Sequence, residues 1–549
     1  MINIQLKVLC RLPVLFLMLV AMISGCAGKT EYPEATALDK KRFIDFQVLA
    51  INDFHGALEA EEERPGGAAY LASHLLAAEA SAQFSITVSA GDLVGASPLI
   101  SSLFHDEPSV EAANIWGLDY HAMGNHELDE GLAEMLRLQK GGSHPVDADA
   151  DGVEYEGANF PFLSANMYLK KDQTLPLPGY AIEEIDGIPV AIIGLTLSDT
   201  LSVLSLEAGK GLAFENEADS INRLVDKLRK QSIEAFIVLI HEGGSQSGDS
   251  FGGCDNFQGD VINVINEVSP AVDLFVSGHT HNYYLCELGG RPVTSAGSNG
   301  RLYSKIHMRL DRRSGDMELV SMENIPVTHD VAPNADLAGM VEKYRTFVKP
   351  FAEKPVGKIE ASFSRTPNLA GESLLGQVIA DAQLEATQES GAQIAFMNPG
   401  GIRKHMDYSG DGTVTFEDIF AINPFNSVLV SMTLTGDQLK FLLEQQWQST
   451  NTVRILAVSK GFSYTWNANA STGQHVDAQS MFLDGVQIDP LAEYRITTNS
   501  FIAEGGDGFT IFKEAQNPVW GIEDLEALRR YLEAHSPLVP DYQPRISRN

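Results

Sequence analysis

Five short blocks of potential metal ligands occur in a fixed order along this chain of 549 residues. Their ligating side chains are Asp, His and Asn, and none of the blocks contains a thiolate. Oxygen and imidazole ligands suit Zn, Mn, Fe or Mg rather than sulfur-dependent clusters. A carboxylate shared between two such half-sites could hold two cations close together, an arrangement that promotes in-line displacement at phosphorus. The blocks are Asp53-Phe54-His55, Gly91-Asp92, Gly124-Asn125-His126-Glu127, His241-Glu242 and Gly278-His279-Thr280-His281.

Apolar runs rich in Val, Ile and Leu precede four of these blocks: FQVLAIND, FSITVSAGD, AFIVLIHE and VDLFVSGHTH. Such runs predict buried strands, and the Gly, Asn and clustered His that follow them are poor strand formers. An isolated GD or HE pair carries little information, whereas GNHE and GHTH are far more specific. The five blocks together therefore favour one shared metal site on loops at strand ends over unrelated surface residues.

The N-terminal half has the pattern of a layered α/β fold. From Phe43 to about Pro326, strand candidates alternate with helical stretches at 66–82 and 218–232. The chain is also too long for one ordinary hydrophobic core, so we expect a second large domain.

The pattern changes around residues 330–355, where an amphipathic helix is followed by Pro350 and Pro355. Proline after a helical pattern indicates a helix end, so we place the inter-domain connection there. Beyond it, helices expected at 372–388 and 435–448 are mixed with short strands.

The order D-x-H, GD, GNHE, H and GHTH resembles that of the calcineurin-like metallophosphatases. The segments MNPGGIR (397–403), NPFNS (423–427) and NSFIAEGGDGF (499–509) resemble the 5'-nucleotidase branch of that superfamily, which includes bacterial UDP-sugar hydrolases. The resemblance covers about residues 43–515. It implies a four-layer α/β/β/α metallophosphatase domain at 43–330, a linker helix or hinge at 331–355, and an α/β nucleotidase domain that binds substrate at 356–549.

The resemblance also implies how the ligands divide between two divalent cations. Asp92 is the natural bridge, because a carboxylate has two oxygens and can touch both ions. The metal could be Zn, Mn, Mg or Co. The first ion would be held by Asp53, His55 and His281, and the second by Asn125, His241 and His279.

His126 follows the ligand Asn125 and is not expected to be a ligand itself. Asp129, three residues later, could fix the tautomer of His126 and raise its basicity. This pair would stabilise the transition state or protonate the leaving oxygen. The alternative is that Asp129 is merely a carboxylate at a helix N-terminus.

The C-terminal motifs contain side chains that suit a nucleotide. Phe425 and Phe501 could stack on a base, although ordinary core packing is the alternative for both rings. Asp507 could accept hydrogen bonds from ribose hydroxyls, and the glycines around it allow close backbone approach. Arg403 and Asn398 offer donors to phosphate or to other polar groups of the substrate.

One position departs from the nucleotidase pattern. Related nucleotidases carry one or two arginines just before the helix that begins near ESLLG. Arg365 could match one of them, but Leu369 occupies the closer position. A missing cation would change how terminal phosphates are held, and so which nucleotide is preferred.

The formal charge is 39 − 73 = −34. A surface this negative should repel nucleic acid polymers and acidic membranes. Only a local cluster of metal ions and arginines could reverse the field for an anionic substrate.

The N-terminus resembles a bacterial lipoprotein signal. Lys7 and Arg11 form a basic region, an apolar stretch follows at 12–23, and ISGC ends in Cys26. We expect a signal peptide at 1–25, a lipid on Cys26 and a tether at 26–42, with the lipid as the only membrane attachment. Ala27 resembles an outer-membrane sorting residue. The alternatives are a plain secretory peptide or a transmembrane anchor, but the apolar stretch is about half the length that a spanning helix needs.

Cys254 and Cys286 remain after the signal and lipidation cysteines are set aside. In an exported chain they are best interpreted as a disulfide that staples the segment bearing His279 and His281, and the alternative is two unpaired thiols.

Two acidic segments imitate calcium loops. Residues 147–152 lack a Glu at the twelfth position, whereas 407–418 comes closer, with Asp407, Asp411 and a terminal Asp418. The favoured alternative for 407–418 is a turn and a short strand.

These features favour an exported phosphohydrolase that converts nucleotides, including di- and triphosphates, to nucleosides and phosphate. UDP-sugar diphosphatase and 2',3'-cyclic-nucleotide phosphodiesterase activities would use the same metals. A lipoprotein that binds nucleotides without turnover is the non-enzymatic alternative, and the oligomeric state is open.

Overall fold

The computed structural model describes residues 42–549, except 62–63, 147, 149–151, 206, 426 and 449–452. The expected signal peptide, Cys26 and nearly all of the expected tether lie outside the described residues, as does most of the acidic segment 147–152. Among the helices that are described, none is both long and apolar enough to span a bilayer.

Two six-stranded sheets form the N-terminal half of the described chain. In the first, β1, β2, β3 and β4 run parallel, and the β13–β14 hairpin joins antiparallel to β1. The strand order is β14 (Met317–Pro326), β13 (Leu302–Asp311), β1 (Phe43–Ile51), β2 (Ser85–Ser89), β3 (Tyr120–Ala122) and β4 (Phe162–Leu163).

In the second sheet, β12, β10, β9 and β7 run parallel, and an antiparallel strand pairs with each outer member. The order is β11 (Tyr283–Leu288), β12 (Arg291–Ala296), β10 (Leu274–Ser277), β9 (Ala235–Ile240), β7 (Ile188–Leu195) and β6 (Tyr180–Ile185).

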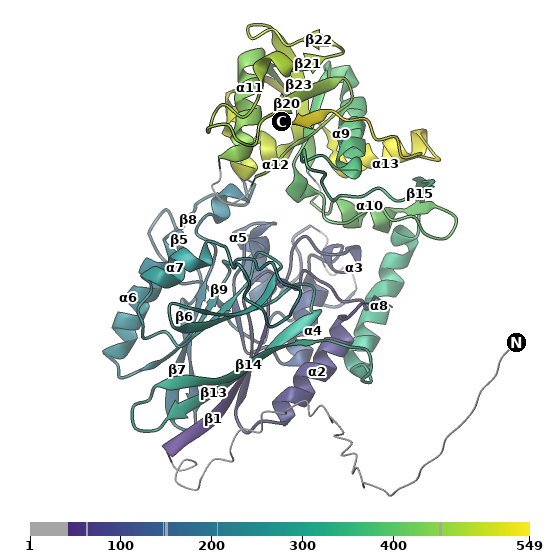
Figure 1. Cartoon of the computed structure of the whole chain (residues 1–549). Coiled ribbons are helices and arrows are strands. Elements are labelled where there is room, and N and C mark those ends of the chain that lie inside the picture. Colours follow the sequence, from purple (N-terminus) through teal and green to yellow (C-terminus); the bar gives the residue numbers. More distant parts are fainter. Residues whose placement is uncertain are drawn as a thin grey trace, which may run out of the picture. The chain divides into compact units, whose positions relative to one another are not determined.

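Both faces of the inner parallel strands, such as β2, β9 and β10, are buried, which explains the unbroken apolar runs in the sequence. Along β1, Val48 and Ala50 join the core between the two sheets, whereas Leu49 and Ile51 join the core beneath the outer helices. Helices α2 (Ala68–Ala80) and α4 (Glu107–Trp116) cover the first sheet, and α6 (Glu217–Arg229) and α7 (Val261–Glu267) cover the second (Figure 1). The predicted four-layer α/β/β/α fold is confirmed.

Helix α8 (Ala335–Ala352) leads to the C-terminal half and packs against α2, α3 (Leu99–Ser102) and α4. The Asn334 side chain caps it by accepting a 3.0 Å hydrogen bond from the Leu337 amide. The expectation that this helix ends before Pro350 is wrong, since Pro350 lies inside its last turn. A proline there removes only one hydrogen bond near the helix end, so the helix continues.

The C-terminal half is built on a mixed five-stranded sheet. Its order is β19 (Ala457–Val458), β16 (Ile394–Met397), β23 (Glu493–Asn499), β18 (Val428–Thr435) and β24 (Gln516–Glu523). The helices are α9 (Leu374–Ala386), α10 (Phe416–Ile422), α11 (Gly436–Glu444), α12 (Ser500–Ala503) and α13 (Asp524–Ala534), labelled in Figure 1.

Smaller elements complete the described chain. Helix α5 (Leu132–Lys140) follows β3, and β5 (Met167–Leu169) pairs with β8 (Leu212–Phe214). Strand β15 (Pro355–Lys358) pairs with β17 (Thr413–Thr415). The four-stranded sheet has the order β22 (Val486–Gln487), β21 (Phe482–Leu483), β20 (Phe462–Trp466) and β25 (Ile546–Arg548).

The segment 407–418 forms a turn, strand β17 and the start of α10. Asp411 accepts from Thr413 and pairs with Lys358, while Asp418 forms a reciprocal capping box with Thr415. Both carboxylates are therefore engaged in local structure rather than in a calcium loop.

Candidate active site

The predicted metal ligands lie on loops at the carboxyl ends of parallel strands from both sheets. Asp53 and His55 follow β1, and Asp92 follows β2. Asn125 follows β3, and His241 directly follows β9. His279 and His281 follow β10. Sites in α/β folds are commonly built on such loops, because rigid strands fix where each loop begins.

Several of these residues adopt a backbone conformation that L-amino acids rarely use. The φ angle is positive at Asp53, His55, Asp92, His279 and His281, between 50° and 69°. Each such residue carries a conformational cost that the surrounding structure must offset. Strain concentrated at five residues of one site points to a functional demand on their side-chain directions.

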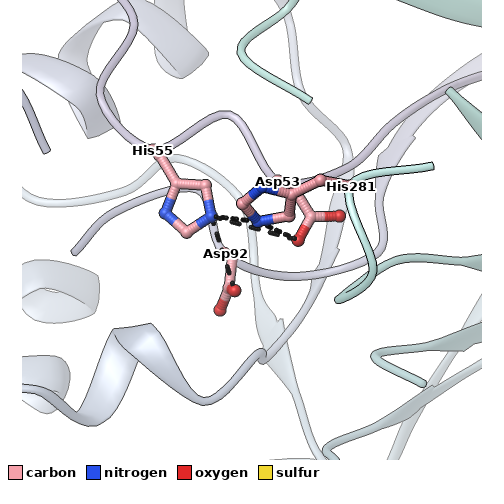
Figure 2. Close-up of side chains that lie close together, drawn as sticks. All are labelled: Asp53, His55, Asp92 and His281. Carbon is pink, nitrogen blue, oxygen red and sulfur yellow. Dashed lines mark hydrogen bonds and ion pairs between the residues drawn. The ribbon is translucent and has the colours of Figure 1, made fainter. Parts of the chain in front are cut away.

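One group of potential ligands gathers around the β1 loop, as Figure 2 shows. His55 Nε2 lies 3.0 Å from His281 Nε2 and 3.6 Å from Asp92 Oδ2. Asp53 Oδ1 lies 3.4 Å from His281 Nε2. These four side chains form the first set.

A second group contains Asp92, His241 and His279. His241 Nε2 lies 3.0 Å from Asp92 Oδ2, and His279 Nδ1 lies 3.1 Å from the Asn125 side-chain oxygen. Asp92 is thus common to both groups, which is the position required of a bridging carboxylate.

The donor set fits two divalent cations. His241 Nδ1 lies 2.8 Å from the Ala90 carbonyl, and its buried Nε2 points to the shared carboxylate of Asp92 at 3.0 Å. His55 Nδ1 likewise lies 2.8 Å from the Gly95 carbonyl. Backbone acceptors of this kind fix the tautomer so that the other ring nitrogen presents its lone pair to a metal.

Electrostatics within the cluster are strongly perturbed. Burial lowers the pKa of His55 and of His279 to about 3, so both imidazoles are neutral and able to donate a lone pair. Burial alone would raise the pKa of Asp92, but the neighbouring His241 and His126 hold it well below its usual value. Asp92 is therefore an ionised carboxylate.

His126 is oriented by Asp129, whose Oδ2 lies 2.8 Å from His126 Nδ1. The His126 amide also donates to Asp92 Oδ1 at 3.0 Å, which ties this residue to the candidate bridge. Although burial acts to lower it, the pKa of His126 is raised by Asp129 and Asp92. Asp129 thus contacts the imidazole directly rather than serving only as a helix-terminal charge.

A cavity of about 390 Å³ connects these groups with the C-terminal half. Most of the residues predicted to bind substrate line the same space as potential ligands and the His126–Asp129 pair. The lining includes Asn125, His126, Asp129, His279, Asn398, Arg403, Phe425, Phe501 and Asp507.

The two phenylalanines have defined neighbours in this cavity. The Phe425 ring lies 6.2 Å from that of His126 at an interplanar angle of 23°, and the Arg403 guanidinium lies 5.9 Å from its centroid. The Phe501 ring packs over Gly506, where an added Cβ would lie only 2.5 Å from the ring. Glycine at 506 is therefore required for this ring position.

Asp507 belongs to a polar network. It accepts from Asn398 Nδ2 at 2.9 Å and lies 3.3 Å from Arg454 Nε. Asn398 in turn accepts from Asn499 at 2.9 Å. Burial raises the pKa of Asp507, while Arg454 and Asn398 act against that shift.

Arg365 is placed differently from the other predicted substrate residues. It is exposed, donates to the Arg403 carbonyl, and lines a second cavity of about 610 Å³ that also contains His55 and His281. Leu369 is 84% exposed and is not among the residues that line either cavity.

Sequence reasoning missed several residues of the site. Arg454, beside Asp507, stands outside any recognisable motif, and Asn423 and Asp524 line the first cavity as a pair 2.8 Å apart. Arg64 and Arg301 add charge to the second cavity. Only Asn423 had a detectable signature, since it opens the segment NPFNS.

The cysteines behave as a structural pair. Cys254 and Cys286 are joined in a disulfide with a Cα–Cα distance of 5.3 Å. Cys286 lies on β11, directly after the loop of His279 and His281.

Comparison with known proteins gives these observations a context. The calcineurin-like phosphoesterase family matches residues 46–283, and the C-terminal domain of the 5'-nucleotidases matches residues 355–514. The cell wall protein Lmo0130 of Listeria monocytogenes is 30% identical over 531 residues, or 89% of this chain and 67% of that protein. This chain belongs to the 5'-nucleotidase family of calcineurin-like phosphoesterases.

Two further relatives illustrate the range of this family. Endonuclease YhcR of Bacillus subtilis is 30% identical over 505 residues, and the chain spans only 40% of its length. The crystal structure of a 5'-nucleotidase precursor from Thermus thermophilus superimposes with a TM-score of 0.76 at 24% identity, covering 92% of this chain and 99% of that one. The nucleotidase fold therefore extends over nearly the whole described chain.

Proposed function

We propose that this chain is a metal-dependent phosphohydrolase of the 5'-nucleotidase type, which converts nucleotides to nucleosides and phosphate. The proposal rests mainly on the cavity of about 390 Å³, because one space contains candidate ligands, the His126–Asp129 pair and two aromatic rings. A nucleotide has the same combination of parts, with a phosphate at one end and a flat base at the other.

We assign the seven residues Asp53, His55, Asp92, Asn125, His241, His279 and His281 to two divalent cations. When bound, two adjacent cations lower the pKa of water and neutralise phosphate oxygens as charge develops. Asp92 would hold its two oxygens toward both sets of ligands, and the backbone acceptors of His55 and His241 would keep their ring nitrogens correctly aimed.

His126 would act on the ester oxygen that leaves phosphorus. Because Asp129 accepts at Nδ1, Nε2 is the atom through which His126 donates a proton or a hydrogen bond to that oxygen. Arg403, beside Phe425 in the same cavity, would supply positive charge to the phosphate.

The C-terminal residues would hold the nucleoside. Phe425 and Phe501 would contact the base, and Asp507 would accept from ribose hydroxyls. Asn398 already donates to Asp507, so it would keep that carboxylate in place rather than bind substrate alone. Arg365, in the second cavity, would contact phosphates beyond the first.

A substrate panel separates this proposal from its alternatives. With Mn²⁺, we expect AMP to be hydrolysed more efficiently than UDP-glucose, 2',3'-cyclic CMP, bis-p-nitrophenyl phosphate or single-stranded DNA. Preferred cleavage of DNA would instead favour an endonuclease, and equal rates on AMP and the p-nitrophenyl ester would remove the case for nucleotide specificity. Asp92→Asn is the matched control and should lose nearly all hydrolysis, so activity within tenfold of wild type would contradict the bridging assignment.

We also propose export and lipid attachment at Cys26, which the apolar segment and the ISGC sequence support. Labelling with a radioactive fatty acid should mark the wild-type protein and not Cys26→Ser. A strongly negative chain would depend on this lipid, rather than on its own surface, for contact with anionic membranes.

A further inference from the structure

A cluster of histidine and glutamate lies outside the site described above and was not found from sequence motifs. Among the described residues, His105, Glu130 and His144 form a third group whose potential ligand atoms all lie within 4.8 Å of one another. Each residue comes from a different loop. His105 precedes α4, Glu130 precedes α5 and His144 follows α5.

The three side chains are already in close contact. His105 Nδ1 lies 2.9 Å from Glu130 Oε2, and the His105 and His144 rings are stacked with centroids 3.5 Å apart. The two imidazoles are largely buried, with side-chain exposures of 18% and 10%, whereas Glu130 is 47% exposed. The cluster thus has two sheltered nitrogen donors and one carboxylate that can move.

A fourth acidic side chain, Glu134, lies near this cluster but is already paired with Arg137. Glu134 lies 3.9 Å from His144 Nε2, but both of its oxygens already accept from Arg137. Arg137 also donates to the Gly142 carbonyl at 2.8 Å and so holds the loop that bears His144. The potential ligand atoms that gather here belong to His105, Glu130 and His144, and Glu134 contributes negative charge nearby.

We propose that His105, Glu130 and His144 bind a third divalent cation of the zinc type, separate from the two cations of the active site. Two imidazoles and one carboxylate form a zinc ligand set that leaves the fourth position to water. A tetrahedral zinc site holds its ligand atoms about 3.4 Å apart, so loading requires the rings to leave their stack and close on the ion. Imidazole ligands select Zn, Co, Ni or Cu over Mg and Ca.

The position of this cation would join loops that support the active site. Glu130 directly follows Asp129, the partner of His126. Asp106, next to His105, accepts from the Gly95 amide at 2.9 Å, and the Gly95 carbonyl orients His55. A cation at the third site would therefore clamp both loops from the outside without touching substrate.

Zinc stoichiometry tests the proposal. Full-length protein is stripped with a chelator, dialysed against about 10 µM free zinc, and analysed for metal per chain. We expect one zinc fewer in His144→Asn and in Glu130→Gln than in wild type, and no difference among the three proteins after the same dialysis with magnesium. His535→Asn is the matched control, because His535 pairs with Glu385 at 2.9 Å on another surface and should keep the wild-type count.

Glu130→Gln decides the outcome if the histidine variant folds poorly, because its side chain is half exposed. The third site is supported if Glu130→Gln binds one zinc fewer than wild type while His535→Asn binds as many zinc ions as wild type. An equal zinc count in wild type and Glu130→Gln overturns it. Neither result depends on the substrate of the enzyme, so the proposed nucleotidase function can fail while this site stands.

Discussion

Glu127 and His121 form a buried pair beside the loops of Asp92 and Asn125, with Glu127 Oε1 3.1 Å from His121 Nε2. The same carboxylate accepts three backbone amides from those loops: Leu93 at 2.7 Å, Gly124 at 2.6 Å and Asp92 at 3.2 Å. Burial would raise the pKa of Glu127, but His121 holds it below its usual value. One ionised carboxylate therefore fixes the spacing of the Asp92 and Asn125 loops.

Glu127→Gln should weaken metal binding as well as stability. In Gln an NH₂ group replaces one carboxylate oxygen. If it replaces Oε2, it faces the Asp92 and Gly124 amides, which are also donors, so two buried hydrogen bonds are lost. We expect a loss of roughly 1–3 kcal/mol in the free energy of unfolding and a metal affinity about 10–100-fold lower. Chelator competition and chemical denaturation measure the two effects.

Glu444→Gln is the matched control for this substitution. Glu444 is also a buried carboxylate, and it accepts the His475 and Val476 amides at 3.0 and 2.8 Å in the C-terminal half. The control should lose stability while keeping wild-type metal affinity. If Glu127→Gln binds metal as tightly as wild type, its role is limited to folding.

His126→Ala should keep both active-site cations and lower kcat by roughly 10²–10⁴, the usual effect of removing an acid–base or electrostatic group. Its ring contacts Asp129 and lies edge-on to the His55 ring, with centroids 5.1 Å apart, but His126 is not in either group of potential ligands. Elemental analysis and steady-state kinetics on AMP test this assignment. A fall in metal content would show instead that His126 is a ligand.

The N-terminal fold was accessible from sequence because both faces of its strands are buried. That burial gives long apolar runs, and four of the five ligand blocks follow directly where a run stops. The helices were located by their apolar spacing, as in α2 (Ala68–Ala80) within the expected 66–82. The four layers themselves came from the family resemblance, since strand order is a property of long-range pairing such as β1 with β13.

The residues that sequence reasoning missed are positioned by tertiary structure alone. Arg454 reaches Asp507 across 53 positions, and His105 meets His144 through two loops without a common motif. Pro350 was misjudged because proline is tolerated in the last turn of a helix whose other contacts hold it in place. No local pattern encodes these relationships, so only the folded chain displays them.

Removing both aromatic rings from the substrate cavity should affect nucleotides selectively. Base–aromatic stacking contributes about 1–3 kcal/mol per base, so Phe425→Ala with Phe501→Ala should raise KM for AMP by roughly 5-fold to 160-fold. KM for p-nitrophenyl phosphate should change far less, because that ester has no base. An unchanged KM for AMP would show that the base does not contact these rings.

Gly506→Ala tests the same contact with a smaller change. An added methyl group would lie 2.5 Å from the Phe501 ring and must displace it. We expect KM for AMP to rise as in Phe501→Ala, with kcat for p-nitrophenyl phosphate unaffected. If Gly506→Ala has the wild-type KM for AMP, the position of the Phe501 ring does not determine the affinity for AMP.

Asp273 and Asp119 should make the protein less stable as pH rises, which is the reverse of the usual carboxylate effect. Each side chain accepts a backbone amide at 2.8 Å, Asp273 from Phe236 and Asp119 from Thr87. Burial is the main cause that raises the pKa of Asp273 to about 8 and that of Asp119 to about 6. The pKa of Asp in the unfolded chain is about 3.9. Between about pH 3.9 and the pKa in the folded protein, the native state therefore holds a proton that the unfolded state has released.

The free energy of unfolding therefore falls over that interval, up to about pH 8 for Asp273 and about pH 6 for Asp119. Asp273→Asn cannot titrate and keeps an oxygen acceptor for Phe236, so it should gain on the order of 2–4 kcal/mol relative to wild type between pH 5 and 8. Asp119→Asn should show its gain mostly below pH 6.5, which makes each variant the control for the other. Denaturant unfolding at pH 5, 6.5 and 8 measures both, and parallel pH profiles for wild type and Asp273→Asn would show that this carboxyl is ionised in the native protein.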